Sequence, residues 1–584
     1  MSAEGSVMTT ESLLCLVKTA YSKVQILRNE SSKDPETEPY KSKYEAEKIL
    51  KEIKSVLSDI SEDLKCDSTL NYKAILSHVY FQLGCIALDV EETQKAEEYF
   101  RDCLNLVESD ALSSKHILTV LSALNFLGIL WSQKLDASKA FEYLSRAENL
   151  YKDYIKDSKE KPIDVLEIIF DKTVSSSENS KKSSPLDILY TSTLHHLAEI
   201  HFVLGNDVKS AVYCHETLSR QLASEEFDAI EWALDSATLA QFFLKKSGFK
   251  EARNHLAAAS VILDKYESEL YSVEETSEEL EAKKERFQYR SADVARCWAK
   301  YGLMLLSASK ERLLESDSDT QETYPDELKA LNFDSLDLSA YESQVTAQYI
   351  LMFEDARLVF FNVRHWLKKA EEYYQLENHA SDYAKIVQDM SELYKILAFY
   401  EDDESRQSKM YKRQIDCLED LVGKLNPQYY LDICRQVWFE LGETYATIFY
   451  LKENQLKKEN CPNPQLLKKC NHYADQSINN YINFLNSFKD THGKMPEKFD
   501  ENWERPILLS FFYIARMLGK IVTADRQLRF DKTKESLNYY ELMVDYADAN
   551  ETAANVIGIE LGVARDMVKL LPLKLEKILA VPEN

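Results

Sequence analysis

Small and large apolar residues recur in paired segments along this chain. In each first segment a bulky residue, or Ser in one copy, is followed three positions later by Leu-Gly or Leu-Ala and then by a large residue or Ala. The second segment carries a small residue, a larger one four positions later and a small one after three more. Four pairs are Tyr80, Leu83, Gly84 and Ala87 with Ala96, Phe100 and Cys103; Leu124, Leu127, Gly128 and Trp131 with Ala140, Leu144 and Ala147; Leu194, Leu197, Ala198 and His201 with Ser210, Cys214 and Thr217; and Ser236, Leu239, Ala240 and Phe243 with Ala252, Leu256 and Ala259. Downstream, Trp438, Leu441, Gly442 and Tyr445 repeat the first segment. Because small residues let two helices approach and large ones fill the space beside them, the pattern predicts antiparallel helical hairpins.

This spacing resembles the tetratricopeptide repeat. Gly84 and Gly128, at matching positions, lie 44 residues apart, and Ala198 and Ala240 lie 42 apart, whereas the usual period is about 34. We therefore expect longer helices than usual. The predicted fold is all-α: a tetratricopeptide-like right-handed solenoid of helical hairpins, in two halves joined by a linker helix.

Three stretches interrupt the pattern. The segment Lys156–Pro185 is rich in Ser and Lys and reads as an inserted loop, and Glu267–Glu281 and Glu315–Glu327 are acidic. Between the acidic stretches, Phe287–Leu314 carries an apolar stripe with Trp298 and Tyr301 and is predicted as one helix that connects the halves. The expected division is residues 1–265 for N-terminal hairpins, 266–340 for acidic loops around the linker helix (about 287–314), and 341–584 for C-terminal hairpins.

Helical patterns resume near Tyr341. The predicted helices are Phe353–Leu376, Ala380–Tyr400, Arg406–Lys424, Gln428–Leu456, Leu466–Phe488, Ile507–Thr523, Lys532–Ala547 and Ala553–Leu571. Pro fits the first turn of a helix, so Asn426-Pro427 and Arg505-Pro506 are interpreted as two of the helix starts.

Composition supports helices and limits the partners. The 584 residues include only 12 Gly and 12 Pro, two residues that long helices exclude. The formal net charge is −27, which disfavours nucleic acid and anionic membrane surfaces and favours a partner with a basic face. Acidity also simply keeps a large protein soluble, and that reading remains open.

Cysteine usage and the absence of a leader favour a reducing compartment. The ten cysteines include no C-x-x-C pair, and Cys85, Cys103 and Cys214 sit inside apolar helical patterns, where a thiol acts as a small hydrophobe. No secretory signal peptide is recognised. The uncharged run His116–Gln133 contains polar residues and is interpreted as a buried solenoid helix, without membrane insertion.

Catalytic motifs are not found. Gly423-Lys424, Gly493-Lys494 and Gly519-Lys520 lack the other elements of a phosphate-binding loop. The one histidine cluster comprises His195, His196 and His201 with Glu199. One helix face can present His195 and Glu199 to a metal, but His201 occupies a packing position, so we favour packing or a ligand-binding surface over a metal site. We expect no enzyme activity, no cofactor and no metal.

Several strings along the whole chain resemble the kinesin-binding protein (KIF-binding protein) family. They are Glu38-Pro39-Tyr40-Lys41-Ser42-Lys43-Tyr44, Leu127-Gly128-Ile129-Leu130-Trp131-Ser132, Ile230-Glu231-Trp232-Ala233, Ala295-Arg296-Cys297-Trp298, Val387-Gln388-Asp389, Leu397-Ala398-Phe399, Leu425-Asn426-Pro427-Gln428-Tyr429-Tyr430-Leu431 and Gly519-Lys520-Ile521-Val522-Thr523-Ala524-Asp525. The resemblance implies a non-enzymatic protein that grips kinesin motor domains in a concave acidic groove, blocks their attachment to microtubules, and so regulates organelle transport, including that of mitochondria, and axon growth. It also implies a cytoplasmic, cytoskeleton-associated protein that is a monomer when bound to one motor domain.

The resemblance places the motor-binding residues on central hairpins. The matching positions are His196, Glu199, Gln221 and Thr238, with Gln241 one turn beyond. Family members can carry Tyr and Gln at the positions of His196 and Glu199, so charge replaces aromatic stacking here. The same residues can also serve only to solvate the groove. The alternative function is an adaptor or co-chaperone scaffold that clamps another protein's peptide segment, which requires Lys, Arg and Asn on the inner helices.

Overall fold

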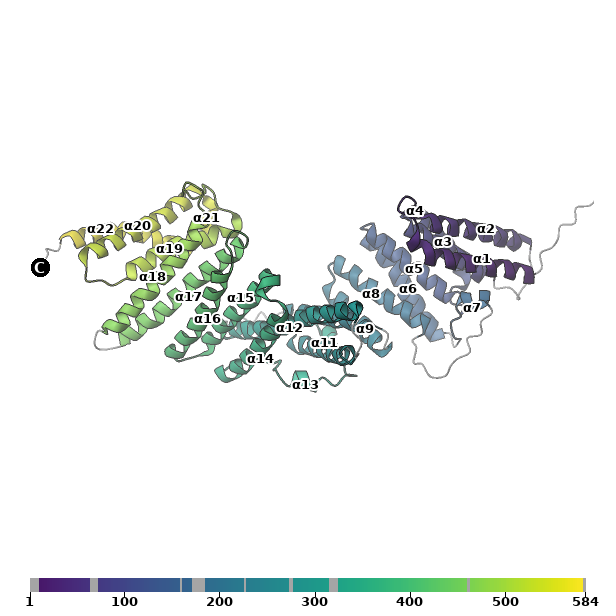
Figure 1. The fold of residues 1–584 in the computed structure, drawn as a ribbon, viewed down its shortest axis with the longest axis horizontal. Helices are drawn as coiled ribbons and strands as arrows, with labels where there is room; N and C mark the ends of the chain where they lie inside the picture. The colour runs from purple at the N-terminus through teal and green to yellow at the C-terminus, as the bar shows by residue number, and fades with distance from the viewer. Residues whose placement is uncertain are drawn as a thin grey trace, which may run out of the picture. The chain divides into compact units, whose positions relative to one another are not determined.

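The computed structural model describes residues 10–63, 72–157, 160–170, 184–224, 227–272, 277–314, 324–458 and 463–580, and these residues form helices and no strand (Figure 1). The prediction of an all-α fold is confirmed. The chain divides into two compact units, Met1–Phe242 with Thr323–Leu336 and Phe243–Glu322 with Asp337–Asn584. The domain boundaries inferred from the sequence, which fall elsewhere, stay a prediction.

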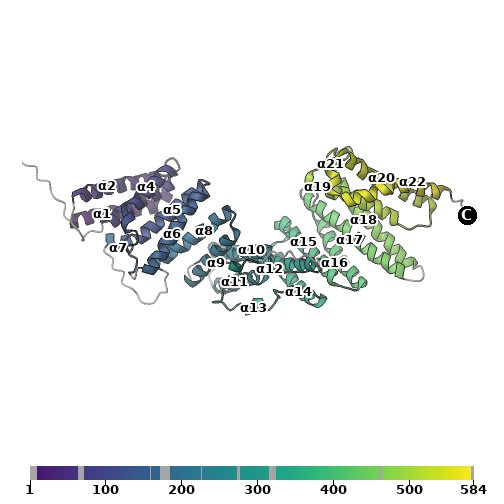
Figure 2. The same ribbon diagram turned by 180° about the vertical axis from the view of Figure 1, so that it is seen from behind.

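The first unit is built from helical pairs that pack as antiparallel hairpins. Figure 1 shows them from purple to blue. Their helices are α1 (Thr10–Glu30), α2 (Lys41–Asp63), α3 (Tyr72–Asp89), α4 (Thr93–Val107), α5 (Ile117–Gln133), α6 (Ala137–Asp157), α7 (Val165–Phe170), α8 (Pro185–Val203), α9 (Asp207–Ser224) and most of α10 (Ala229–Lys245). Helix α10 is labelled in Figure 2. The single-turn helices η1 (Ser31–Lys33), η2 (Glu108–Asp110) and η3 (Asp326–Leu328) complete the unit.

The small residues of the repeat pattern lie against the large ones. A methyl group at Gly84 of α3 would lie 2.5 Å from the ring of Phe100 in α4, and one at Gly128 of α5 would lie 2.6 Å from Cγ of Leu144 in α6. Phe100 and Leu144 are fully buried. The predicted packing of these two hairpins is confirmed.

The hairpin turns share one backbone geometry. Glu91, Leu135, Gly205 and Ser247 each adopt a left-handed conformation with φ between 62° and 74°. In each turn the next residue donates a backbone hydrogen bond to the carbonyl five positions before it, from Glu92 to Ala87, Asp136 to Trp131, Asn206 to His201 and Gly248 to Phe243. This is the Schellman arrangement that satisfies the last carbonyl groups of a helix. It closes four hairpins, although only one of them has glycine at the left-handed position.

The second unit contains the predicted linker helix and the C-terminal hairpins. Its helices are α11 (Phe249–Leu270), α12 (Glu278–Leu314), α13 (Ser339–Glu342), α14 (Phe353–Tyr373), α15 (Leu376–Tyr400), α16 (Glu404–Lys424), α17 (Leu431–Lys458), α18 (Pro464–Asn486), α19 (Glu501–Lys520), α20 (Arg526–Ala549), α21 (Glu551–Val556) and α22 (Gly558–Ala580). The single helix predicted for Phe287–Leu314 ends where expected and starts earlier, at Glu278. Its buried Trp298 stacks on Trp366 of α14 with ring centroids 5.5 Å apart.

Two predicted helix starts are wrong. Pro506 lies inside α19, which begins at Glu501 because the side chain of Asp500 accepts a hydrogen bond from the backbone of Asn502 and caps the helix. Pro427 lies in a turn ahead of α17, which begins only at Leu431. Proline therefore marked a region near each start, but a capping side chain or a turn sets the first residue.

The interrupting stretches are only partly described. A short helix, α7, lies within the predicted loop Lys156–Pro185 and buries Val165 and Ile169 against α1 and α3. The rest of that loop at 158–159 and 171–183, and residues 273–276 and 315–323 of the acidic stretches, lie outside the described residues.

Two sequence-based expectations concern membranes and thiols. Among the helices of the described ranges, none is both long enough and apolar enough to cross a lipid bilayer. The eight described cysteines are free thiols. Burial raises the pKa of the Cys85 thiol to about 12 and that of Cys214 to about 11, as expected for thiols that pack as small apolar groups.

Candidate partner-binding site

Helices α8, α9 and α10 carry all five residues that the sequence analysis placed in a binding site. Pro185 occupies the first turn of α8, where its missing N–H costs nothing. Gly205, with φ of 74°, ends that hairpin turn before α9. Asp228 starts α10 because its carboxylate accepts hydrogen bonds from the backbone N–H groups of Ile230 and Glu231 at 2.9 and 3.0 Å.

Helix α8 separates an apolar face from a polar one. Its buried face includes Leu194, Leu197 and His201 and packs against α5 and α6. His201 stacks on Tyr213 with centroids 5.3 Å apart, and burial lowers its pKa, so the predicted packing role of His201 is confirmed. The opposite face presents His195 and Glu199 to solvent.

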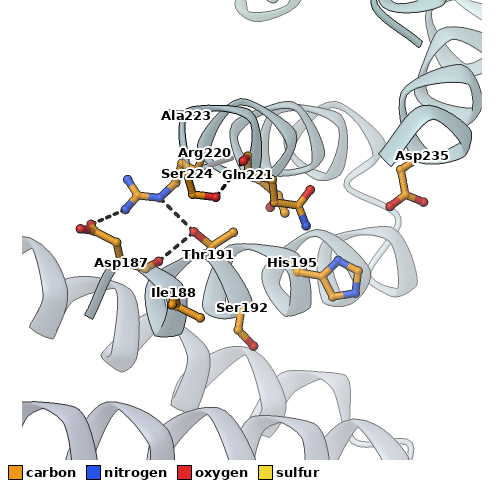
Figure 3. Close-up of a pocket in the computed structure, with 11 residues that line it drawn as sticks. Asp187, Ile188, Thr191, Ser192, His195, Arg220, Gln221, Ala223, Ser224 and Asp235 are labelled. Carbon is orange, nitrogen blue, oxygen red and sulfur yellow. Dashed lines mark hydrogen bonds and ion pairs between the residues drawn. The ribbon is translucent and has the colours of Figure 1, made fainter. Parts of the chain in front are cut away.

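A cavity of about 590 Å³ lies beside this polar face (Figure 3). It is bounded by one face each of α8, α9 and α10. Its lining residues are Asp187, Ile188, Thr191, Ser192, His195, Thr217, Arg220, Gln221, Ala223, Ser224 and Asp235. Hydroxyl, amide and charged groups alternate with aliphatic groups in this lining, so it can receive a partner side chain that has both an apolar and a polar part.

The guanidinium of Arg220 is held at one end of the cavity. It donates hydrogen bonds to the Asp187 carboxylate at 2.7 Å, the Tyr151 hydroxyl at 3.1 Å and the Thr191 hydroxyl at 3.2 Å. It also lies 4.7 Å from the ring centroid of Tyr190, which stacks on Tyr151. These contacts engage the Nε and Nη2 donors of Arg220 and neutralise its charge with Asp187, so Arg220 organises the wall of the cavity.

The carboxylate of Asp235 lies at the other end of the cavity, on the side that His195 faces (Figure 3). Within the described ranges, no Lys or Arg lies within ion-pair distance of Asp235. Partial burial raises its pKa, and the nearby His195 opposes that shift. Since Arg220 and Asp187 neutralise each other, the uncompensated charge of the cavity is that of Asp235.

The five predicted residues fall into two groups. His196 and Glu199 contact each other on α8, with 3.1 Å between Nδ1 and a carboxylate oxygen, and Gln221 lines the cavity. Thr238 and Gln241 lie one turn apart on α10, where Thr238 is exposed. Both polar atoms of the Gln241 amide are buried with no hydrogen-bond partner in the described part of the chain, a state that costs about 1–3 kcal/mol. Their role in binding stays a prediction.

Three further residues belong to the site and were missed from the sequence. Asp235 lies one turn before Thr238 on the same helix, so the spacing of three offered a signal for it. Asp187 and Arg220 offered none, because their ion pair joins positions 33 residues apart in the sequence.

His195, His196 and Glu199 bring three possible metal ligands together. One ligand atom from each lies within 4.8 Å of the others. His201, the fourth member of the predicted cluster, is buried on the other face of α8.

The sequence and the fold both match known proteins. The family described as KIF-1 binding protein C terminal matches residues 230–578. The KIF-binding protein of Gallus gallus is 36% identical over 576 residues, covering 94% of this chain and 95% of the relative, and that of Homo sapiens is 34% identical over 595 residues, covering 94% and 96%. A solved structure titled "Kinesin binding protein (KBP)" aligns with a TM-score of 0.64 and 30% identity over 97% of this chain and 99% of that one. These descriptions specify a binding partner rather than a reaction.

Proposed function

Because the chain belongs to the KIF-binding protein family, we propose that it binds kinesin motor domains through the surface of α8, α9 and α10 and blocks their attachment to microtubules. It acts by occupying the motor and catalyses no reaction. By withholding motors from their track it regulates organelle transport and axon growth, from the cytoplasm and the cytoskeleton.

Uncompensated acidity around the cavity supports this proposal. Glu199 and Asp235 are surface carboxylates, of which Asp235 is partly shielded, and the nearby groups that could carry positive charge are histidines rather than Lys or Arg. The guanidinium of Arg220 is already paired with Asp187. Such a surface attracts a cationic partner, and the face with which a motor meets acidic tubulin is cationic by the same complementarity.

The same observation separates this function from that of a peptide-clamping adaptor. An adaptor that holds an acidic peptide tail needs free cations on its inner helices. In the described lining of the cavity the one Lys or Arg side chain is Arg220, and four of its neighbours already hold it. The adaptor function therefore has the weaker support.

Cosedimentation of motor domains with microtubules tests the proposal. With a non-hydrolysable nucleotide, motor domains pellet with the filaments, and an excess of this protein should move them to the supernatant. The variant E199K/D235K should lose this effect, because it replaces two attracting charges with two repelling ones. The control E98K/E142K makes the same change of charge at exposed positions on α4 and α6 and should still release the motor.

Two results would contradict the proposal. Motors that stay on the filament despite excess wild-type protein would exclude competition for the track-binding face. Equal activity of the two double variants would show that net charge, rather than this surface, governs binding. Circular dichroism of each variant confirms that helicity is retained.

A further inference from the structure

Three side chains on one turn of α8 converge although two of them are adjacent in sequence. Successive residues of a helix project about 100° apart, so His195 and His196 alone would diverge. Glu199 projects about 40° from His195 and about 60° from His196, between the two. Its carboxylate thus lies within reach of both imidazoles, 3.7 Å from His195 Nε2 and 3.1 Å from His196 Nδ1.

The separations match the coordination sphere of a zinc ion. Zinc binds imidazole nitrogen and carboxylate oxygen at about 2.0–2.2 Å, which places neighbouring ligands of a tetrahedron about 3.3–3.5 Å apart. The three ligand atoms here lie within 4.8 Å of one another, a spread not much larger than the edge of such a tetrahedron. Imidazole and carboxylate together favour zinc and its neighbours over magnesium or calcium.

His195 and Glu199 are exposed side chains outside the core, whereas His196 is partly buried. His195 and Glu199 are exposed over 55% and 58% of their side-chain surface, and His196 over 22%. His201, two residues further, shows the contrast, since it is 3% exposed and lies between aromatic rings. A metal can therefore reach the three ligands from solvent.

We propose that His195, His196 and Glu199 form a binding site for zinc or a similar divalent transition metal. The protein supplies three ligands, and the fourth position stays open to water. Sites with three protein ligands and an open position are an established form of zinc binding. The site needs both histidines in their neutral form, since only a free nitrogen lone pair binds the metal.

Binding of the ion would change the surface to which we assign the motor, and this second step rests on the proposed function. Glu199 contributes a charge of −1, and with the ion bound the same three side chains carry +1. A cationic partner attracted by the free carboxylate is then repelled. Zinc thus opposes motor binding, and the site makes the affinity for the motor depend on the concentration of free metal ion.

Cobalt and zinc titrations of the full-length protein, purified with a chelator and dialysed free of it, test the site. Co²⁺ should bind with one equivalent per chain and show the ligand-field bands of a four- or five-coordinate ion. H195A, H196A and E199Q should each weaken binding about tenfold or more, whereas H492A, which removes an exposed histidine from a loop of the second unit, should not. Unchanged affinity in the three variants would overturn the site, as would a thiolate-to-cobalt charge-transfer band that marks cysteine ligands.

The coupling is measured as the ratio of motor affinities with and without Zn²⁺. That ratio should fall at least several-fold for the wild type and for H492A, and equal one for H195A. A wild-type ratio of one refutes the coupling. If the chelator-treated protein fails to bind any motor, the proposed function and the coupling fall together, while the cobalt titration still decides the metal site.

Discussion

The glycine at position 128 offers a direct test of how the hairpins are held together. A Cβ atom built there would lie 2.6 Å from Cγ and 2.7 Å from Cδ2 of Leu144. Since Cγ is the branch point of a fully buried side chain, the contact cannot be relieved by moving a flexible tip. We expect G128A to push α5 and α6 apart.

The magnitude follows from two opposing terms. Replacing glycine by alanine inside a helix favours folding by about 0.5–1 kcal/mol. Overpacking of a filled core costs about 1–3 kcal/mol. Because the new methyl group would meet a buried branch point at 2.6 Å, the overpacking term should lie in the upper part of its range, and the net destabilisation of this hairpin should be about 1–2 kcal/mol. The control G562A lies inside α22, where nothing stands within 4 Å of the new methyl group, and it should stabilise its helix by about 0.5–1 kcal/mol.

Hydrogen exchange read by mass spectrometry is the suitable assay, because a chain of two units need not unfold in one step. Peptides from Ile117–Gln133 and Ala137–Asp157 should exchange faster in G128A than in the wild type, and those from Gly558–Ala580 more slowly in G562A. In G128A/L144A the two changes should compensate in part, so the double variant should lose less than the sum of the single ones. Strict additivity, or protection in G128A equal to the wild type, would refute the close packing of these helices.

Four other changes test separate features. L135G should stabilise the α5–α6 hairpin by about 1 kcal/mol in the same exchange assay, because Leu135 holds a left-handed conformation with φ of 62° that glycine adopts without strain. Burial lowers the pKa of His78 to about 4. Between about pH 6.5 and pH 4 the unfolded chain therefore binds a proton that the folded chain does not, and the free energy of unfolding falls as the pH drops. In H78F, the loss of unfolding free energy across that window, measured by thermal unfolding, should be smaller by up to about 3 kcal/mol. R220K should cost about 1 kcal/mol in urea unfolding of the first unit, since lysine keeps the charge but cannot reach Asp187, Tyr151 and Thr191 together. Motor affinity, measured by fluorescence anisotropy, should fall as the Debye length shrinks from about 30 Å at 0.01 M salt to about 8 Å at 0.15 M, and a salt-independent affinity would indicate an apolar interface instead.

The helices and their pairing were accessible from sequence because local patterns determine them. Gly84 and Gly128 each pack against a large residue 16 positions on, a distance fixed by helix length and a short turn. The left-handed turns at Glu91 and Leu135 were not accessible, since the usual rules expect glycine there. In these turns backbone hydrogen bonds outweigh the strain of a side chain.

The candidate site was less predictable, because it depends on contacts between distant positions. His201 was recognised as a packing residue from its place in the repeat. Asp235 was overlooked, since an acidic residue on a polar helix face is common and its lack of a cation partner shows only in three dimensions. Spacing places His195, His196 and Glu199 on one side of their helix, but the approach of their ligand atoms depends on side-chain torsions that spacing leaves open.

The hairpin turns of the first unit have a consequence for how such a protein can diversify. Backbone hydrogen bonds close these turns. The left-handed residue at each tip points its side chain outward, as the exposed Glu91 and Leu135 do. An acid stands at one tip, an aliphatic group at the next and no side chain at Gly205. Substitutions at these tips can therefore change the surface chemistry without moving the helices, so new contacts can evolve there with little effect on folding.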